Sequence, residues 1–349
     1  MGGKGVWVIA VFVGLVWSCA FPPVNCLPVA WLTPALLLWV TYASPKRSFQ
    51  LGLAAGLAHY FSSLSWLLYI PVSPGNIAGW LALSGYCSLY PALWAAFCWR
   101  LFPGDREKPI NESIQELQFS RRCAWGLACA VGWVALECLR GWVITGFPWN
   151  YLGASQLEFN RLAQLASFTG VLGVSLVVAW VSVGGLLLFW RCQKEKRFQT
   201  QCLAELAGPL GLLLVAVILG SVELSKPLPA KKGEIKIALI QPSIPQTVLW
   251  DLGNEQAQRD RFEHLMDLSD QAMKEDLDLT RLRRSRQGRR GQPPQTYWMA
   301  TLLTMSESGG RSRLIPTMQL FDSPEPLVSQ GSRPSTIIAP QALHFMNNA

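Results

Sequence analysis

The sequence predicts a membrane bundle of about seven helices, then the start of an α/β domain, then a disordered tail. Three observations indicate this order. Long stretches lack charged side chains, lysine and arginine gather in alternate loops between those stretches, and a strand followed by an amphipathic helix comes after the last stretch. The corresponding segments are residues 1–225, 226–278 and 279–349.

Charge is scarce in the first segment. Hydrophobic residues make up 50% of the whole chain and charged residues 15%, whereas soluble domains carry roughly 25% charged residues. Apart from His59, which can be protonated, no charged residue (Lys, Arg, Asp or Glu) occurs in residues 5–45, 48–99, 162–190 or 206–222. A membrane-spanning helix needs about 20 mainly apolar residues. With proline-rich turns dividing the longer stretches, the expected spans are about 5–21, 27–43, 50–70, 76–99, 123–143, 165–190 and 205–223.

The positions of lysine and arginine predict the orientation of these spans. Fourteen such residues precede Lys226, and with a cytoplasmic N-terminus twelve of them face the cytoplasm. Only Arg140 and Arg161 then lie on the outer side. Because cytoplasmic loops are enriched in positive charge, we expect this orientation, and an odd number of spans places everything after about residue 225 in the periplasm.

The fifth expected span contains Glu137 and Arg140, which stand three residues apart. A helix places such a pair on one face, where the two charges can meet. A structural ion pair and a role in a substrate path both fit this pattern. His59 lies in the third span with Ser62, Ser63 and Ser65, and a polar cluster there fits either a helix-packing hydrogen bond or a functional site.

The segment after the membrane spans begins as an α/β unit. Residues 234–241 alternate in the manner of a strand, and residues 255–276 have the apolar stripe of an amphipathic helix. The pattern ends near residue 279, and 279–349 is rich in Arg, Ser, Pro and Gln. This composition predicts disorder. A frameshift near residue 279 and a genuine disordered tail both account for it.

Cysteine and arginine patterns limit the classes of function. The nine cysteines contain no CxxC pair, and the last of them is Cys202, so we expect no metal site, no redox site and no cofactor. An arginine cluster at 281–290 would suit nucleic acid on a cytoplasmic protein, but its expected export excludes that partner.

Two motifs carry a family resemblance. The third outer loop, residues 140–153, reads RGWVITGFPWNYLG, and the expected strand ends in IQPSIPQ at 240–246, with Trp250 and Asp251 following. With Gln164 and the run GVLGVS at 170–175, they closely resemble apolipoprotein N-acyltransferases. The resemblance covers residues 1 to about 278.

The resemblance implies a membrane bundle that carries a periplasmic, nitrilase-like domain in the bacterial inner membrane. It also implies a monomer without a cofactor. A cysteine thiolate takes an acyl chain from a phospholipid, and the acyl chain then passes to the N-terminal amine of an apolipoprotein's lipid-modified cysteine. The chemistry needs a glutamate to relay protons and a lysine to stabilise the oxyanion.

The three catalytic groups of the family are not encoded in this sequence. The glutamate is due just after Leu279, where residues 280–283 read TRLR, and neither lysine after Lys274 nor cysteine after Cys202 occurs. We therefore expect a chain that is inactive as written, with no catalytic residue to assign. The alternative is a non-catalytic membrane protein that binds lipid or protein partners. A transporter is disfavoured because the spans lack paired interior charges beyond Glu137 and Arg140.

Two residues remain as substrate-loop candidates. Phe147 and Trp149 lie in the third outer loop, which in the family flanks the entrance for the acyl chain. A contact with the lipid substrate and an ordinary aromatic residue at the membrane border are both consistent with their position.

Overall fold

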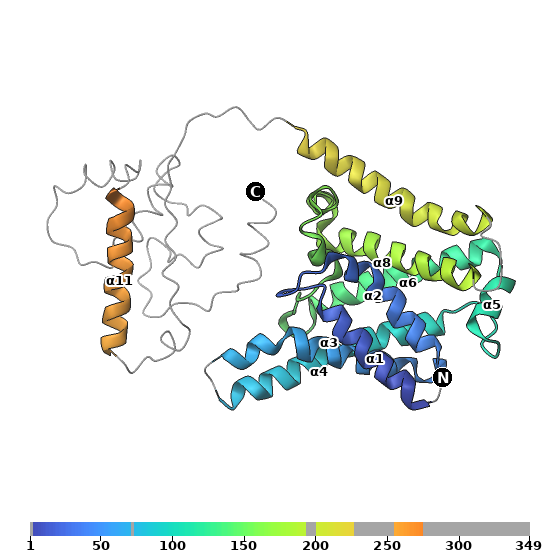
Figure 1. The fold of residues 1–349 in the computed structure, drawn as a ribbon, viewed down its shortest axis with the longest axis horizontal. Coiled ribbons are helices and arrows are strands. Elements are labelled where there is room, and N and C mark those ends of the chain that lie inside the picture. The colour runs from blue at the N-terminus through green and yellow to red at the C-terminus, as the bar shows by residue number, and fades with distance from the viewer. Residues whose placement is uncertain (1–2, 71–72, 193–199, 227–254, 275–349) are drawn as a thin grey trace. The chain divides into compact units, whose positions relative to one another are not determined.

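The computed structural model describes residues 3–70, 73–192, 200–226 and 255–274, and the chain divides into two units, 1–227 and 228–349. The first unit is a bundle of helices, and the described residues of the second form one helix (Figure 1). All regular structure in these ranges is helical.

Seven long helices occupy the positions that the charge pattern predicts. They are α1 (Gly3–Ser18), α2 (Leu27–Tyr42), α3 (Ser48–Ser63), α4 (Gly75–Arg100), α6 (Phe119–Arg140), α8 (Ala166–Cys192) and α9 (Thr200–Leu224). Shorter helical pieces connect them: η1 (Pro45–Arg47), η2 (Ser65–Tyr69), α5 (Ile110–Glu116), η3 (Val143–Thr145), η4 (Leu152–Gln156) and α7 (Asn160–Ala163).

Fewer of these helices are long enough to cross a membrane than the seven expected. By length and composition, α4, α6, α8 and most of α9 qualify, and α2 with the segment Pro45–Ser63 makes a fifth if that pair, bent by 115°, is one span. The helices α1, α2 and α3 have 16 residues each. That is about 24 Å, against a hydrocarbon core of about 30 Å. The expected third span, 50–70, ends as a helix at Ser63 because 65–69 forms a separate 3₁₀ turn.

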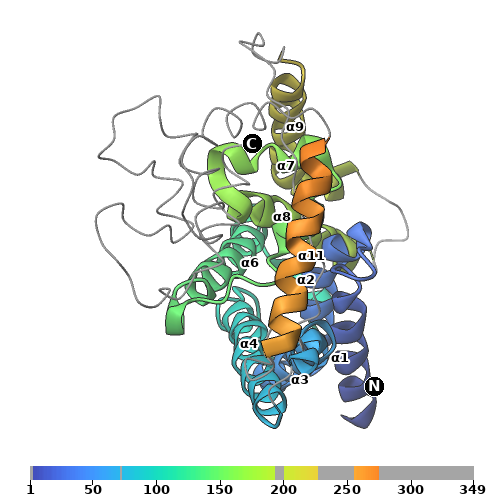
Figure 2. The same cartoon turned by 90° about the vertical axis from the view of Figure 1, so that its left-hand side faces the viewer.

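Small residues bring α1, α3 and α4 close together. The helix α3 packs between α1 and α4 (Figure 2). A Cβ atom at Gly14 of α1 would lie 2.1 Å from the Ala55 carbonyl oxygen, and one at Gly56 of α3 would lie 2.7 Å from Pro91 of α4. Gly52 and Gly56 form the small-xxx-small spacing that lets membrane helices approach closely.

The other half of the bundle is built around α8, which contacts α2, α6 and α9. Its regular path is interrupted at Gly170, where φ is +66°. Indole groups join α4 to α6 in the core. The Trp94 Nε1 donates to the Cys129 carbonyl oxygen at 2.8 Å, and the Trp125 Nε1 donates to that of Cys98 at 3.1 Å.

The outer surface of α9 is apolar. Leu210, Leu214, Ile218 and Val222 are all exposed, and the four-residue spacing places them along one side of the helix. Large apolar side chains in contact with water would be unfavourable, so this stripe fits a helix that faces lipid. Together with the long apolar helices, it makes the first unit a multi-pass membrane bundle.

One end of the bundle holds a buried ionic cluster. The Glu205 carboxylate of α9 lies 2.6 Å from the Arg122 side chain of α6 and 3.1 Å from that of Arg191 at the end of α8. A second nitrogen of Arg122 donates to the Leu117 carbonyl oxygen. The start of α6, the end of α8 and the start of α9 therefore share one end of the bundle.

The described part of the second unit is α11 (Glu255–Lys274). Its position confirms the helix that the sequence predicts over 255–276. The expected strand at 234–241 and the tail at 279–349 lie outside the described residues.

Candidate functional site

The loop that follows α6 contains the substrate-loop candidates and has an unusual backbone. Ile144, Thr145 and Asn150 all have positive φ angles, as does Gly146 at +82°. A Cβ atom at Gly146 would lie 2.1 Å from the Gly141 carbonyl oxygen, so the chain turns back on itself here. The Phe147 amide closes this turn by donating to the Arg140 carbonyl oxygen at 2.9 Å.

The two candidate residues lie together in this loop. The Phe147 and Trp149 rings are stacked with centroids 5.8 Å apart, and the Trp149 ring also lies 5.3 Å from the Trp66 ring of η2. Trp149 remains 45% exposed, whereas Phe147 packs against the core. The structure thus brings Trp66, which sequence reasoning did not identify, beside the two residues that it did.

Hydrogen bonds fasten the end of the loop to two helices. The Asn150 Nδ2 donates to the Ser63 Oγ of α3 at 2.9 Å and lies 3.3 Å from the His59 Nε2. The Leu152 amide donates to the Glu137 Oε1 of α6 at 2.7 Å. Trp149 therefore lies between the Phe147 amide, which is bonded to Arg140, and Asn150, which is bonded to Ser63.

His59 is a packing residue as well as part of an anchor. Its ring is fully buried and stacks on the Trp17 ring with centroids 3.7 Å apart. Of the three serines that accompany it in sequence, Ser63 shares its contact with Asn150. These contacts favour the helix-packing interpretation of the cluster and add a loop contact to it.

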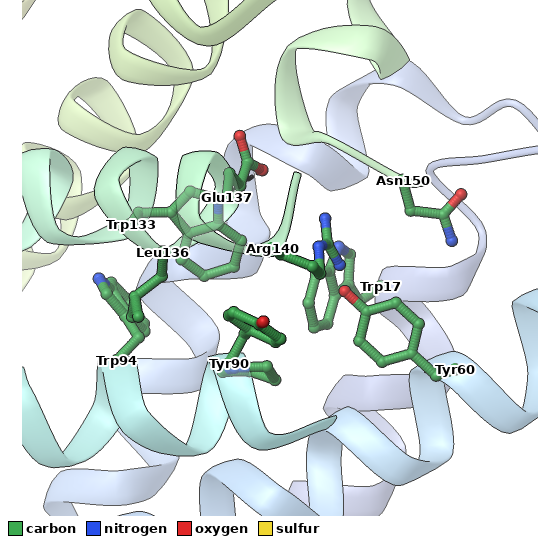
Figure 3. A pocket seen from close by; sticks show the side chains of 10 residues that line it. Trp17, Tyr60, Tyr90, Trp94, Trp133, Leu136, Glu137, Arg140 and Asn150 are labelled. Carbon is green, nitrogen blue, oxygen red and sulfur yellow. Dashed lines mark hydrogen bonds between the residues drawn. The ribbon is translucent and has the colours of Figure 1, made fainter. Parts of the chain in front are cut away.

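Glu137 and Arg140 do not form the ion pair that their spacing allows. Among the described residues no carboxylate lies within 4 Å of the Arg140 guanidinium. Glu137 instead accepts hydrogen bonds from the Trp133 Nε1 at 2.9 Å and the Leu152 amide. Of the two interpretations that the spacing left open, the structural ion pair is therefore not formed: the carboxylate points away from Arg140 (Figure 3).

Arg140 is surrounded by aromatic rings. Its guanidinium carbon lies 5.3 Å from the Tyr151 ring centroid, 5.4 Å from that of Tyr60 and 6.0 Å from that of Tyr90. Burial raises the pKa of Tyr151 to about 12, although the positive charge of Arg140 opposes the rise. Tyr151 therefore stays neutral and supplies a ring face, with no counter-charge for the arginine.

A cavity of about 20 Å³ adjoins this buried polar centre. Figure 3 shows Arg140 in the middle of its lining. The lining comes from α1, α3, α4, α6 and the loop, and comprises Trp17, Tyr60, Tyr90, Pro91, Trp94, Trp133, Leu136, Glu137, Arg140 and Asn150.

The described cysteines differ in exposure: Cys26 is exposed, and Cys19, Cys123, Cys138 and Cys192 are partly buried. Cys87, Cys98 and Cys129 are buried in α4 and α6, where apolar surroundings disfavour a thiolate. Cys202, the last cysteine of the sequence, belongs to α9. Within the four described ranges no group of three or more His, Cys, Asp or Glu side chains is placed to hold a metal ion.

Comparison with known proteins gives one consistent result. Residues 13–184 match the family model described as the apolipoprotein N-acyltransferase N-terminal domain. An apolipoprotein N-acyltransferase of Geobacter metallireducens is 30% identical over 254 residues, which is 70% of this chain and 44% of that protein. The corresponding protein of Vibrio parahaemolyticus is 32% identical over 251 residues, covering 69% and 44%.

A third relative is similar in extent. The Rickettsia prowazekii apolipoprotein N-acyltransferase is 29% identical over 246 residues, with 70% of this chain and 46% of that protein aligned. The chain thus spans less than half the length of the curated relatives that it matches.

Proposed function

Because the chain belongs to the apolipoprotein N-acyltransferase family through its N-terminal domain, we propose that it serves lipoprotein N-acylation. The donor is a phospholipid and the acceptor is the N-terminal amine of an apolipoprotein's diacylglyceryl-cysteine. In the complete reaction a cysteine thiolate attacks the acyl ester, the lysophospholipid leaves, and the amine then releases the thiol from the thioester. In this series of reaction steps, the described residues of the chain bind the phospholipid donor.

The anchored loop carries this proposal. Trp149 is partly exposed, stacks with Phe147 and Trp66, and is fixed by the Asn150 and Leu152 hydrogen bonds. A rigid aromatic group beside an apolar helix bundle gives an acyl chain a large contact area at low entropic cost. We propose that Phe147 and Trp149 contact the acyl chain of the donor.

Photo-crosslinking tests the lipid contact. The full chain is reconstituted with a phosphatidylethanolamine that carries a diazirine in one acyl chain, and mass spectrometry locates the crosslinks. We expect crosslinks on the peptide around residues 147–149, and a several-fold lower yield in Trp149→Ala. Trp142→Ala is the matched control, since Trp142 lies in the same loop and is 81% exposed. Equal yields in the two variants would refute the contact.

A second candidate function follows from the sequence. No lysine follows Lys274 and no cysteine follows Cys202 among these 349 residues, so we propose that they do not catalyse acyl transfer by themselves. On this view the chain is a non-catalytic membrane protein that binds lipid or partners. Expression in a strain depleted of the acyltransferase separates the two functions, since growth would demonstrate activity.

The remaining features are part of the same proposal. The bundle lies in the bacterial inner membrane, its N-terminus is cytoplasmic, and residues after about 225 are periplasmic. It acts as a monomer and binds no nucleic acid. Residues 226–278 begin a nitrilase-like domain, and 279–349 are a frameshifted or disordered tail. Reading the other two frames of the gene after codon 279 tests the last point, because a Trp-Pro-Glu motif and a downstream cysteine there would indicate a frameshift.

A further inference from the structure

Two side chains of opposite charge are buried in α6 without a direct contact between them. Arg140 is 2% exposed and Glu137 is 6% exposed. Among the described residues, the Arg140 Nε and the Glu137 Oε2 each have no hydrogen-bond partner, and no carboxylate lies within 4 Å of the guanidinium. Taking charges out of water is costly unless hydrogen bonds or other charges compensate for them. A molecule that bridges the two groups would offset this cost.

The neighbouring protein groups satisfy the two charges only in part. Three tyrosine rings attract the Arg140 guanidinium, but a ring face does not replace the acceptor that the Nε–H seeks. The Glu137 carboxylate uses its Oε1 to accept from Trp133 and Leu152. Its Oε2 is therefore left to accept from something other than these donors.

A third buried atom without a partner belongs to α1. Trp17 is 3% exposed, and its ring stacks on the His59 ring, but its indole Nε1–H has no hydrogen-bond partner among the described residues. Trp17, Glu137 and Arg140 all line the cavity of about 20 Å³ (Figure 3). Three side chains that each carry an unsatisfied polar atom thus surround one small space.

The size and the charges of this cavity select its ligand. A buried water molecule needs at least about 10–15 Å³ of such space and two to four polar partners, and a space of about 20 Å³ holds one. An anion there would meet the Glu137 carboxylate and a cation would meet the Arg140 guanidinium, so a neutral ligand is favoured. Two of the unsatisfied atoms carry a proton to donate and the third accepts, which suits a molecule that both accepts and donates.

We propose that this cavity is a binding site for one water molecule. The water accepts from the Arg140 Nε–H and the Trp17 Nε1–H and donates to the Glu137 Oε2, so that the two charges form a water-mediated ion pair. Because Glu137 also holds the Leu152 amide, the water joins α1 and the end of α6 to the loop that follows. The site requires neither acyl transfer nor a bound lipid.

Radiolytic hydroxyl-radical labelling of the full chain in detergent tests this site. Short X-ray pulses split water, and the radicals oxidise side chains beside the water from which they form, including buried ones. Trp17 and Trp125 are both 3% exposed, but the Trp125 indole donates to the Cys98 carbonyl oxygen and does not line the cavity. We expect mass spectrometry to show several-fold faster oxidation of Trp17 than of Trp125. Equal rates would overturn the proposal.

A cavity-filling variant provides the second measurement. Leu136 lines the cavity, so the larger ring of Leu136→Phe should occupy the space of the water and lower the oxidation rate of Trp17 to that of Trp125. Leu139→Phe is the matched control, because Leu139 lies on the same helix, is 49% exposed and is not part of the lining. It should leave the rate unchanged.

An unaltered Trp17 rate in Leu136→Phe would also contradict the water site. If that variant does not fold, the comparison of Trp17 with Trp125 in the unaltered chain decides alone. Neither measurement depends on the crosslinking yield at Trp149, so the water site and the proposed lipid contact can fail independently.

Discussion

Glu137 illustrates how one buried side chain positions a loop. Its Oε1 accepts from the Trp133 indole within α6 and from the Leu152 amide in the loop. The first bond fixes the direction of the carboxylate, and the second holds the loop at that point. Glu137 is therefore a positioning residue for the segment that bears Phe147 and Trp149.

Removing this carboxylate should destabilise the bundle. Glu137→Ala leaves the Trp133 and Leu152 donors unsatisfied, and hydrogen bonds to a charged group contribute about 1.5–3 kcal/mol each. We expect a lower midpoint of thermal unfolding in detergent, read by tryptophan fluorescence. Glu158→Ala serves as the control because Glu158 is exposed in the same connection. Equal midpoints for both variants would contradict the anchoring role.

Sequence patterns identified some of these residues and could not identify others. Phe147 and Trp149 were found because the Gly-Phe-Pro-Trp motif marks them locally. Trp66 meets Trp149, and Asn150 meets Ser63 87 residues away, only through tertiary contacts, so no local pattern indicates either contact. The i, i+4 spacing of Trp133 and Glu137 was a usable signal, but only the acidic and basic residues at 137 and 140 were considered as partners.

At the scale of helices, close packing of α3 depends on glycine. Gly56→Leu would place a side chain where a Cβ atom already lies 2.7 Å from Pro91 and 3.0 Å from the Ser88 backbone. Overpacking of this kind costs about 1–3 kcal/mol, so we expect earlier thermal unfolding and broader elution in size-exclusion chromatography. Gly85→Leu on α4 is the control, since nothing lies within 4 Å of a Cβ atom there. A normal profile for Gly56→Leu would show that α3 and α4 can separate without loss.

The ionic cluster makes a second prediction about helices. Glu205→Gln leaves the buried Arg122 and the partly buried Arg191 without their shared carboxylate, and breaking a buried pair in this way costs about 3–5 kcal/mol. The thermal midpoint should fall clearly. Glu116→Gln, which breaks the exposed pair with Lys108, should leave it unchanged because solvent screens such pairs. The cluster would have no structural role if both variants melted alike.

Helix positions were predictable, and the end of α3 was the part that differed most from the expected spans. Charge-free stretches located six of the seven long helices, and α6, which contains Glu137 and Arg140, was located by its mainly apolar sequence. The 3₁₀ turn at 65–69, which reads SWLLY, contains the same kinds of apolar residue as the helices themselves. Composition does not distinguish an apolar turn from an apolar helix, so the expected third span, 50–70, runs past the end of α3 at Ser63.

At the scale of the whole bundle, the positions of the helix ends bear on how the bundle is oriented in the membrane. Arg122, Arg191 and Glu205 meet at one end of the bundle, and Arg122 and Arg191 are among the residues that the charge rule assigns to the cytoplasm. The loop with Trp149 follows the opposite end of α6. The contacts and the charge rule therefore agree on which helix ends lie together.

Reporter fusions test the orientation itself. Alkaline phosphatase, which folds only in the periplasm, should be inactive when fused after Asp105 and active when fused after Lys226. A cytoplasmic fluorescent protein should give the reverse pattern at the same positions. Activity of the phosphatase after Asp105 would reverse the proposed topology.

The first unit was more predictable than the second. Membrane helices are indicated by composition alone, because lipid requires a continuous apolar surface and backbone groups that are satisfied within the segment. An α/β domain depends on pairing between distant strands, and a single expected strand at 234–241 has no partner that the sequence identifies. Only the helix at 255–274 could be compared with the structure.

The Glu205 cluster also has a consequence for the order in which the protein is made. Synthesis proceeds from the N-terminus, so Arg122 and Arg191 enter the membrane border before the residue that joins them. Their shared carboxylate, Glu205, is synthesised later, as part of α9, the last helix of the first unit. That helix closes the bundle during biosynthesis, and a nascent chain halted before residue 205 would present two uncompensated charges to cellular quality control.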